Sequence, residues 1–369
     1  MHLYDIIIQA CERIVSRQRS DGSFEPGWNG PYNDPETPVR NTAHWLISLL
    51  KAYELTGDTL FKNAAVKAAD YLLIPDACPM SASFFCRKNP CKDFSNGLVG
   101  QAWTIEALTI AAQALENNDY MEKALSVFQK HFFDETAGLW RILNVDGSYS
   151  VIDYTFNHQL WFAAAGSLIQ GVGDAKIRKQ INLFLDRTIE SHLRISRKGR
   201  IRHLINTQTT KRNIVSTISN ALNPKQYYQT ASQMKNKEIG YHTFNLYAFA
   251  ILKITMPDHP IWNRPKLLTS LAYINSTEFM EGIANNIYGY PYNPLGFELP
   301  FALQTFKSEI AGHNKSKSWW VEQQLKRCMD IDTGLMTNYT NDPATHAARL
   351  YEAVRLDNLS IDLNMDQLR

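Results

Sequence analysis

The chain has 369 residues, of which 44% are hydrophobic and 20% are charged, and its formal net charge is +2. This composition is typical of a folded globular protein, and it excludes a disordered chain and a strongly basic nucleic-acid-binding protein. No run of about 18 apolar residues occurs, and the first residues lack the basic start of a secretion signal. We therefore expect one large domain, residues 1–369, that is cytoplasmic, has no membrane span and binds no nucleic acid.

Hydrophobic periodicity predicts helices along most of the chain, and strand signals are scarce. Apolar residues recur at the three- and four-residue spacing of one helix face. Charged amphipathic helices, which suit an outer layer facing water, alternate with Ala- and Leu-rich helices, which suit a layer covered on both sides. The predicted helices span residues 2–18, 40–56, 59–73, 96–117, 119–132, 154–170, 174–193, 241–255, 264–274, 296–311, 317–329 and 343–356.

Each predicted inner helix begins with a polar or aromatic motif, and these motifs repeat. Such self-similarity indicates a repeated supersecondary unit, here a pair of helices. Six pairs predict an all-α fold, an (α/α)6 toroid in which the inner helices begin around one shared pocket; an open α-solenoid is the alternative. One polar marker from each helix gives His44, Gln101, His158, His242, Glu298 and His346, spaced by 57, 57, 84, 56 and 48 residues.

The spacing of 84 residues indicates an insertion, residues 197–239, which is rich in Arg and Lys. Two interpretations remain open. The insertion is either a solvated excursion or a flap that brings cations such as Arg200, Arg202, Lys211 and Arg212 to an anionic ligand.

Metal and cofactor motifs are missing from the sequence. The five cysteines are an odd number, and the pair Cys86 and Cys91 has no second pair of ligands at zinc-site spacing. No phosphate-binding loop, dinucleotide fingerprint or metalloprotease motif occurs. We expect no metal and no cofactor.

Side chains at the predicted pocket mouth are candidates for acid–base chemistry. Asp153 precedes the helix of His158, so it is either an N-cap or a partly desolvated carboxyl whose raised pKa suits a general acid or base. Glu298 lies among apolar neighbours, where a carboxylate is costly unless it is paired or used. The candidate catalytic residues are Asp153, His158, His44, His242, Glu298 and His346.

Aromatic rings, amides and an arginine near the same helix starts suit a sugar, although core packing is the alternative for each aromatic residue. Arg40 either pairs with Asp34 or Glu36 or holds a substrate carboxylate. The candidate binding residues are Trp28, Tyr32, Arg40, Asn41, Trp45, Asn96, Gln101, Trp103, Asn157, Trp161, Tyr241, Tyr292 and Asp342.

Three reactions fit this set of residues. Two histidines on opposite sides of a sugar could move a proton, as in an epimerase. A carboxylic acid with a carboxylate could hydrolyse a glycosidic bond. A histidine or tyrosine with an arginine could run β-elimination on a uronate.

The strings "DGSFEPGWNGPYNDPETPVRNTAHW", "DFSNGLVGQAWTIEAL" and "VDGSYSVIDYTFNHQLWFAAAG" resemble AglQ-like proteins of archaeal glycosylation and bacterial surface-polysaccharide gene clusters. The resemblance implies an epimerase or isomerase acting on a uronic-acid-containing oligosaccharide or on its lipid- or nucleotide-linked precursor.

The last string is also distantly similar to unsaturated glucuronyl hydrolases, which are (α/α)6 barrels. This second likeness implies a hydrolase or lyase with Asp153 as proton donor. A non-catalytic glycan-binding toroid is the alternative from another class.

Overall fold

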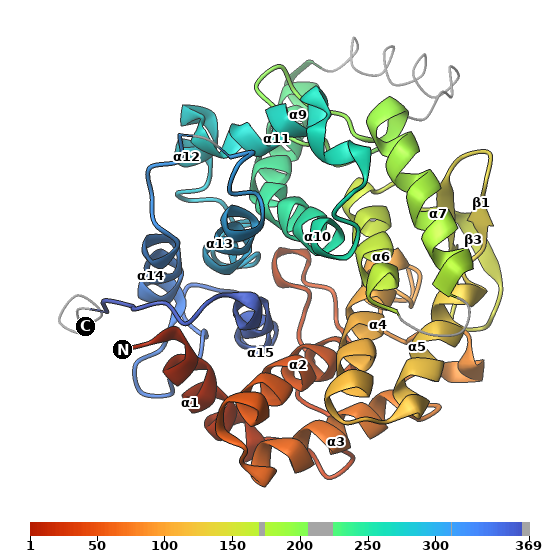
Figure 1. Cartoon of the computed structure of the whole chain (residues 1–369), viewed down its shortest axis with the longest axis vertical. Coiled ribbons are helices and arrows are strands. Elements are labelled where there is room, and N and C mark those ends of the chain that lie inside the picture. The colour runs from red at the N-terminus through yellow and green to blue at the C-terminus, as the bar shows by residue number, and fades with distance from the viewer. Residues whose placement is uncertain (170–173, 206–223, 311, 364–369) are drawn as a thin grey trace.

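The helices form two concentric layers around one axis in the computed structural model, which describes residues 1–169, 174–205, 224–310 and 312–363 (Figure 1). Each inner helix contacts the next one, and the last inner element packs against the first. The ring is therefore closed, which confirms the predicted (α/α)6 toroid over the open solenoid. The inner elements are α2 (Val39–Thr56), α4 (Gly97–Ala114), α6 (Phe156–Leu168), α10 (His242–Thr255), α13 (Leu295–Thr305) and α15 (Pro343–Ala348), which continues as the 3₁₀ helix η6 (Arg349–Arg355).

The outer helices pack against the inner ones, so the inner layer is covered on both sides. Helices α1 and α3 pack on α2, α5 packs on α4, α7 on α6 and α14 on α13. Helix α9 packs on α10 and α12. The bounds are α1 (Leu3–Val15), α3 (Thr59–Leu73), α5 (Asn118–Lys130), α7 (Asp174–Arg187), α9 (Pro224–Gly240), α11 (Pro265–Ala272), α12 (Thr277–Gly282) and α14 (Lys317–Cys328). Short helical turns lie at η1 (Gly30–Tyr32), η2 (Pro79–Ser81), η3 (Thr188–His192), η4 (Pro260–Asn263) and η5 (Tyr273–Asn275).

The two ends of the described chain close the ring side by side. The backbone N–H of Leu3 donates to Leu359, and that of Ile361 donates to Met1, both at 2.9 Å. Helix α1 also contacts α2 and η6. The first outer helix therefore pairs with the last inner element.

The inner helices lack a polar face because they have no side toward water. Nearly every residue of α4 is buried, and the run of Ala163, Ala164, Ala165 and Gly166 in α6 leaves room for close neighbours. A Cβ on Gly166 would lie 2.3 Å from the ring of Phe128 on α5. Small residues here set the distance between the two layers.

The structure differs from the predicted helices in several places, among them the unpredicted helices α9 and α12. A small antiparallel sheet of β1 (Phe133–Asp134), β2 (Leu139–Leu143) and β3 (Tyr149–Ile152) lies between α5 and α6. Its strands are too short to produce a clear two-residue alternation. Helix α13 contains Pro300 and ends at Thr305 rather than at residue 311, and the last predicted helix changes to 3₁₀ geometry after Ala348.

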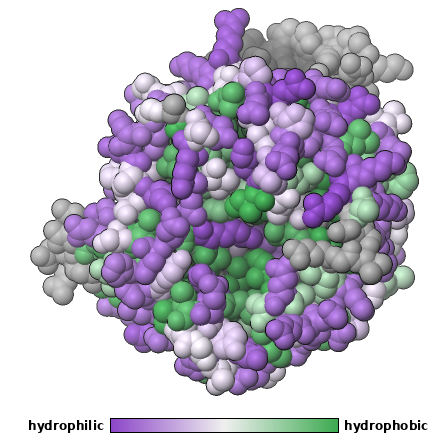
Figure 2. All heavy atoms as spheres, viewed as in Figure 1, coloured by the Kyte–Doolittle hydropathy of each residue, from purple (hydrophilic) through white to green (hydrophobic). Residues whose placement is uncertain are grey.

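The surface drawn in Figure 2 is mainly polar, and hydrophobic residues gather toward its middle. Within the described ranges, no helix has both the length and the hydrophobicity needed to cross a bilayer. Lys211 and Arg212 of the basic insertion lie outside the described residues.

Candidate active site

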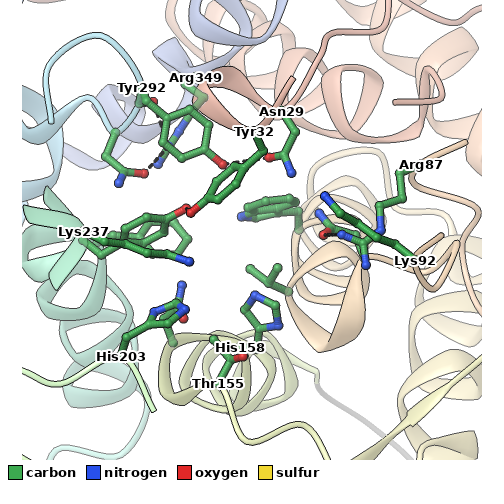
Figure 3. A pocket seen from close by; sticks show the side chains of 17 residues that line it. Asn29, Tyr32, Arg87, Lys92, Thr155, His158, His203, Lys237, Tyr292 and Arg349 are labelled. Atoms are coloured by element: carbon green, nitrogen blue, oxygen red, sulfur yellow. Dashed lines mark hydrogen bonds between the residues drawn. The ribbon is translucent and has the colours of Figure 1, made fainter. Parts of the chain in front are cut away.

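A cavity of about 200 Å³ lies where the inner helices begin (Figure 3). Its size is below the roughly 300–1,000 Å³ of clefts that hold drug-sized ligands, so it suits a small polar ligand. Among the described residues, no carboxylate side chain lines it. The lining residues are Asn29, Tyr32, Arg87, Lys92, Asn96, Val99, Trp103, Thr155, Asn157, His158, His203, Lys237, Tyr241, Phe244, Tyr292, Asn293 and Arg349.

His158 points into the cavity (Figure 3), and Asp153 holds its ring by a hydrogen bond. The His158 Nδ1 lies 2.7 Å from Asp153 Oδ2, and the carboxylate also accepts the backbone N–H groups of Thr155 and Leu98. Burial opposes ionisation of Asp153, but His158 and these backbone donors outweigh it and lower its pKa. The predicted raised pKa of Asp153 is therefore wrong. Asp153 is therefore ionised and binds Nδ1 of His158, so the other ring nitrogen, Nε2, is available to a ligand in the cavity.

Close packing at the start of α4 holds this pair in place. Gly97 has φ +58°, and a Cβ there would lie 2.6 Å from Asp153 Oδ2 and 2.7 Å from His158 Nδ1. Its N–H donates to Asp93. Glycine is needed at this position both for its backbone angle and for the close approach of two side chains.

His203 reaches the same cavity from the basic insertion, and backbone pairing fixes its position. The N–H of Phe156 donates to the carbonyl of His203, and the N–H of Ile205 donates to Tyr154, both at 2.9 Å. This pairing attaches residues 203–205 to the start of α6, where His158 lies. Burial, with the nearby charges of Lys237 and His158, lowers the pKa of His203 to about 3. The cavity therefore presents two imidazoles, of which that of His203 is neutral.

Three cations near the mouth differ in their partners. Lys92 lies 3.0 Å from Asp34, and Arg87 pairs with Asp34 at 3.4 Å and with Asp93. Lys237 of α9 has no carboxylate partner among the described residues; its ammonium lies 5.0 Å from the ring centre of Tyr32. Burial and then the charge of Lys92 lower the pKa of Lys237 to about 8.

Tyrosines form one wall of the cavity. The hydroxyls of Tyr32 and Tyr241 are 2.9 Å apart, and Tyr292 donates to Asn29 at 2.8 Å. Tyr32 belongs to a loop that Asp342 fixes: one oxygen of its carboxylate accepts the N–H groups of Trp28 and Gly30. The other oxygen caps α15 through Thr345. Asp342 therefore acts through this loop and does not line the cavity.

Arg349 brings a buried charge network to the cavity. Its guanidinium donates to Asn293 at 2.6 Å, to Glu298 at 2.9 Å and to Glu352 at 2.5 Å. Burial, and then repulsion from Glu352, raises the pKa of Glu298. Thr243 also donates to Glu298. Glu298 lies behind Arg349, so its contact with the cavity is indirect.

Three of the six repeated polar markers hold loops. Gln101 donates to the carbonyls of Phe84 and Ser95 and accepts the N–H of Phe84, and Gln159 makes the same kind of bonds with Trp140. His242 bonds the Ser270 carbonyl at 3.0 Å, and His346 bonds the Tyr290 carbonyl at 2.8 Å. The repeat therefore reflects side chains that fasten each loop to the next inner helix.

Three of the predicted histidines do not line the cavity. Burial lowers the pKa of His242 to about 3 and of His346 to about 4, so both are neutral. His44 is fully buried, stacks on Tyr351 with ring centres 4.2 Å apart, and has no hydrogen-bond partner among the described residues. His158 alone of the four lies in the cavity, because Gln159 occupies the loop-holding position beside it.

Several predicted binding residues also lie elsewhere. Arg40 is buried, pairs with Glu36 at 3.1 Å and covers one face of Trp103, with its guanidinium carbon 4.1 Å from the ring centre. Asn41 holds the Glu25 carbonyl, and Trp28 is 53% exposed. Trp45 and Trp161 are buried in the core. Seven predicted residues do line the cavity: Tyr32, Asn96, Trp103, Asn157, His158, Tyr241 and Tyr292.

The cavity also has lining residues that no sequence pattern indicated, among them Arg87, Lys92, His203, Lys237 and Arg349. The basic composition of the insertion was a usable signal, but Arg200 and Arg202, which it indicated, do not line the cavity. Arg200 pairs with Glu238 and Glu278, and Arg202 pairs with Glu238, so these cations hold the insertion in place. Among the described residues of the insertion, those that line the cavity are His203 and Lys237.

Comparisons with known proteins agree with this architecture. No protein-family model matches the chain. The structure is similar to cellobiose 2-epimerase from Bacillus thermoamylovorans, with a TM-score of 0.65, 12% identity and coverage of 93% of this chain and 95% of that one. It is also similar to an unsaturated glucuronyl hydrolase specific for heparin, with a TM-score of 0.60, 10% identity and coverage of 96% and 95%. At such low identity these likenesses establish the fold alone.

The sequence itself is much closer to one curated protein. It is 42% identical over 372 residues to the archaeal glycosylation protein Q of Haloferax volcanii, covering 98% of this chain and 99% of that protein. The chain therefore belongs to the family of archaeal glycosylation protein Q.

Proposed function

We propose that the protein is an epimerase or isomerase that moves a proton on a uronic-acid-containing sugar during the building of a glycan. The observation that carries this proposal is the combination of two imidazoles, His158 and His203, with the ammonium of Lys237, which has no carboxylate partner among the described residues, in a cavity whose described lining has no carboxylate. The relative named for archaeal glycosylation and the fold shared with a sugar epimerase support it.

The charges favour an anionic sugar. A partly buried ammonium without a counter-ion is costly, and a ligand carboxylate would supply that counter-ion. Lys92 and Arg87 share their charge with Asp34, so Lys237 is the cation most available to the ligand. The aromatic wall around Tyr32 suits the C–H face of a sugar ring.

The proposed reaction is a proton exchange at the carbon next to the sugar carboxylate. His158 Nε2 removes the proton from this carbon, and Asp153 stabilises the imidazolium that forms. The electron pair of the broken C–H bond moves into the carboxylate, where Lys237 balances the added negative charge. Solvent supplies a proton to the opposite face of this carbon on the His203 side, which gives the epimer, and the proton on His158 returns to solvent. No atom is gained or lost.

Glycoside hydrolysis has weaker support from the geometry. It normally needs two carboxyl groups flanking the scissile bond. Asp153 is only 6% exposed and is engaged by His158, Thr155 and Leu98, and Glu298 lies behind Arg349. β-Elimination remains the second candidate, because the Tyr32 and Tyr241 hydroxyls lie on the same cavity as His158.

Incubation with glucuronate-containing oligosaccharides in deuterated water separates these reactions. Deuterium incorporation without cleavage is the expected result. New reducing ends would indicate hydrolysis, and the ultraviolet absorbance of a new C=C bond would indicate elimination. The matched control is the same oligosaccharide with its carboxyl group reduced to an alcohol, which should bind more weakly and show little effect of salt. Equal binding of both sugars would contradict an acidic substrate.

A further inference from the structure

We propose that a second sugar-binding site lies beside the mouth of the cavity, and that it holds the uncharged sugar next to the acidic one in a glycan chain. The inference rests on the proposed function, since it assumes that the cavity holds the acidic sugar. It concerns a separate hollow of about 340 Å³, lined by Gly30, Pro31, Ile287, Pro291, Tyr339, Thr340 and Asn341.

The hollow and the cavity share two walls. Asn29 and Tyr32 line the cavity, whereas Gly30 and Pro31 between them line the hollow. In the same way Tyr292 lines the cavity and its neighbour Pro291 lines the hollow. The hollow and the cavity therefore lie on opposite sides of the same short turns. Only these turns separate the hollow from the catalytic groups.

The chemistry of the hollow suits a neutral sugar. None of its lining residues is charged. Tyr339 is 52% exposed and Ile287 is 57% exposed, although the removal of such apolar side chains from water is favourable. Exposed apolar groups that gather beside a pocket mark a binding surface. The Tyr339 ring can stack on a sugar face, and the Asn341 amide and Thr340 hydroxyl can bind its hydroxyl groups.

The backbone holds this surface ready for a ligand. Tyr339 has φ +54°, a left-handed conformation that is costly for a bulky side chain and is typical of functional sites. The Asp342 carboxylate fixes the wall that contains Gly30, since it accepts the N–H groups of Trp28 at 2.8 Å and Gly30 at 2.9 Å while it caps α15 through Thr345. A fixed surface loses little conformational entropy on binding.

The test measures binding in the His158→Gln variant, so that no reaction occurs. Calorimetry compares the methyl glycoside of glucuronic acid with disaccharides that carry glucose on either side of the glucuronate. One of the disaccharides should bind about tenfold more tightly than the monosaccharide, the gain expected of one good aromatic contact. Tyr339→Gly should remove this gain without loss of stability, because glycine relieves the backbone strain. Tyr339→Phe should retain it.

The control is Tyr149→Ala on β3, since Tyr149 has a similar exposure of 53% and lies outside the residues that line either space. This variant should keep the full preference for the disaccharide. Equal affinities of the monosaccharide and both disaccharides would overturn the second site and leave the proposed function standing. A preference that survives Tyr339→Gly would also overturn it. Failure of all these sugars to bind would overturn both proposals.

Discussion

Two side chains in the cavity are tuned in opposite ways by what lies behind them. His158 is backed by an ionised carboxylate, which stabilises its protonated form during a proton transfer. Lys237 is backed by tyrosine rings and has a second lysine nearby, so its charged form is destabilised until an anion arrives. The first arrangement favours chemistry and the second favours recognition.

Asp153→Asn and His158→Gln test the proton transfer. Asparagine keeps the shape of the side chain and an oxygen for the backbone donors, but it removes the charge that stabilises the imidazolium. We expect a loss of about 10²-fold or more in kcat for both variants, with native circular dichroism. Full activity of Asp153→Asn in the deuterium-exchange assay would show that Asp153 is only a cap.

Low pH should also reduce the stability that the ionised Asp153 carboxylate contributes to the folded protein. Because the folded pKa of Asp153 is lowered, its contribution to the free energy of unfolding is present above its unfolded pKa of about 3.9 and is lost as pH falls through the folded value. Asp153→Asn should therefore lose less stability than the native protein in a urea titration series below about pH 4. An equal loss of stability in the native protein and in Asp153→Asn over this pH range would contradict this expectation.

Lys237→Met should stabilise the protein while it abolishes binding of the acidic sugar. The folded pKa of about 8 lies below the ordinary value of 10.5, so the unfolded chain binds more protons between these limits and stability rises with pH there. The charge thus costs stability at neutral pH. We expect the variant to melt roughly 2 °C or more higher at about pH 7, and the difference to vanish above about pH 10.5.

The same lysine gives a kinetic prediction. In the native protein, kcat/KM for a uronate should fall above about pH 8 as Lys237 loses its proton. Lys237→Arg keeps the charge to much higher pH and should move this fall upward. An unchanged pH profile in the arginine variant would show that another group controls binding.

At the scale of an element, the start of α4 is where a helix and a catalytic pair meet. Gly97 lets the first turn of α4 pass against Asp153 and His158. The helix thereby supplies the N–H of Leu98 to the carboxylate, at 3.3 Å. Helix placement and side-chain orientation therefore depend on one missing Cβ.

Gly97→Ala should disrupt this arrangement. Its Cβ would come within 2.7 Å of both side chains, and φ +58° is unfavourable for alanine. We expect about 1–2 kcal/mol of lost stability and a large loss of kcat. Gly57→Ala is the matched control, since Gly57 has φ +70° and nothing within 4 Å of the added Cβ. It should lose similar stability and keep its activity; equal activity of the two variants would refute the role of Gly97.

At the scale of the whole molecule, the ring is closed by contacts between its two ends. Residues 1–3 pair with residues 359–361, and α15 and η6 pack against α2. The Asp342 carboxylate then joins the last repeat to the loop of the first. A cavity at the ring axis exists only because all the repeats are present at once.

A circular permutant tests this closure. Joining residues 1 and 363 with a short flexible linker and opening the exposed turn between Asp146 and Gly147 should give a protein with native helicity and a similar melting temperature. Opening the chain between Ala107 and Leu108, both buried in α4, should prevent folding. A failure of the first permutant together with success of the second would contradict the described ring.

The sequence by itself determined the ring. Helical periodicity, alternation of outer and inner helices and the repeated polar markers depend on local spacing, which a linear pattern records. It also determined that His158, Asn157, Trp103, Tyr241 and Tyr292 lie near helix starts that converge. The family followed from the same strings around Asn41, Gly97 and Asp153, and the 42% identity to archaeal glycosylation protein Q confirms it.

Only the tertiary structure decided which polar groups face the cavity. Gln101, His242 and His346 occupy equivalent places in the repeat, yet they hold loops, because backbone carbonyls meet them there. His203 and Lys237 have no repeat signal. His203 reaches the cavity because residues 203–205 pair with the start of α6, and Lys237 reaches it from α9, which packs on α10. The pKa of Asp153 likewise depends on donors that come from another helix. Contacts between distant residues set these properties, so no local pattern could show them.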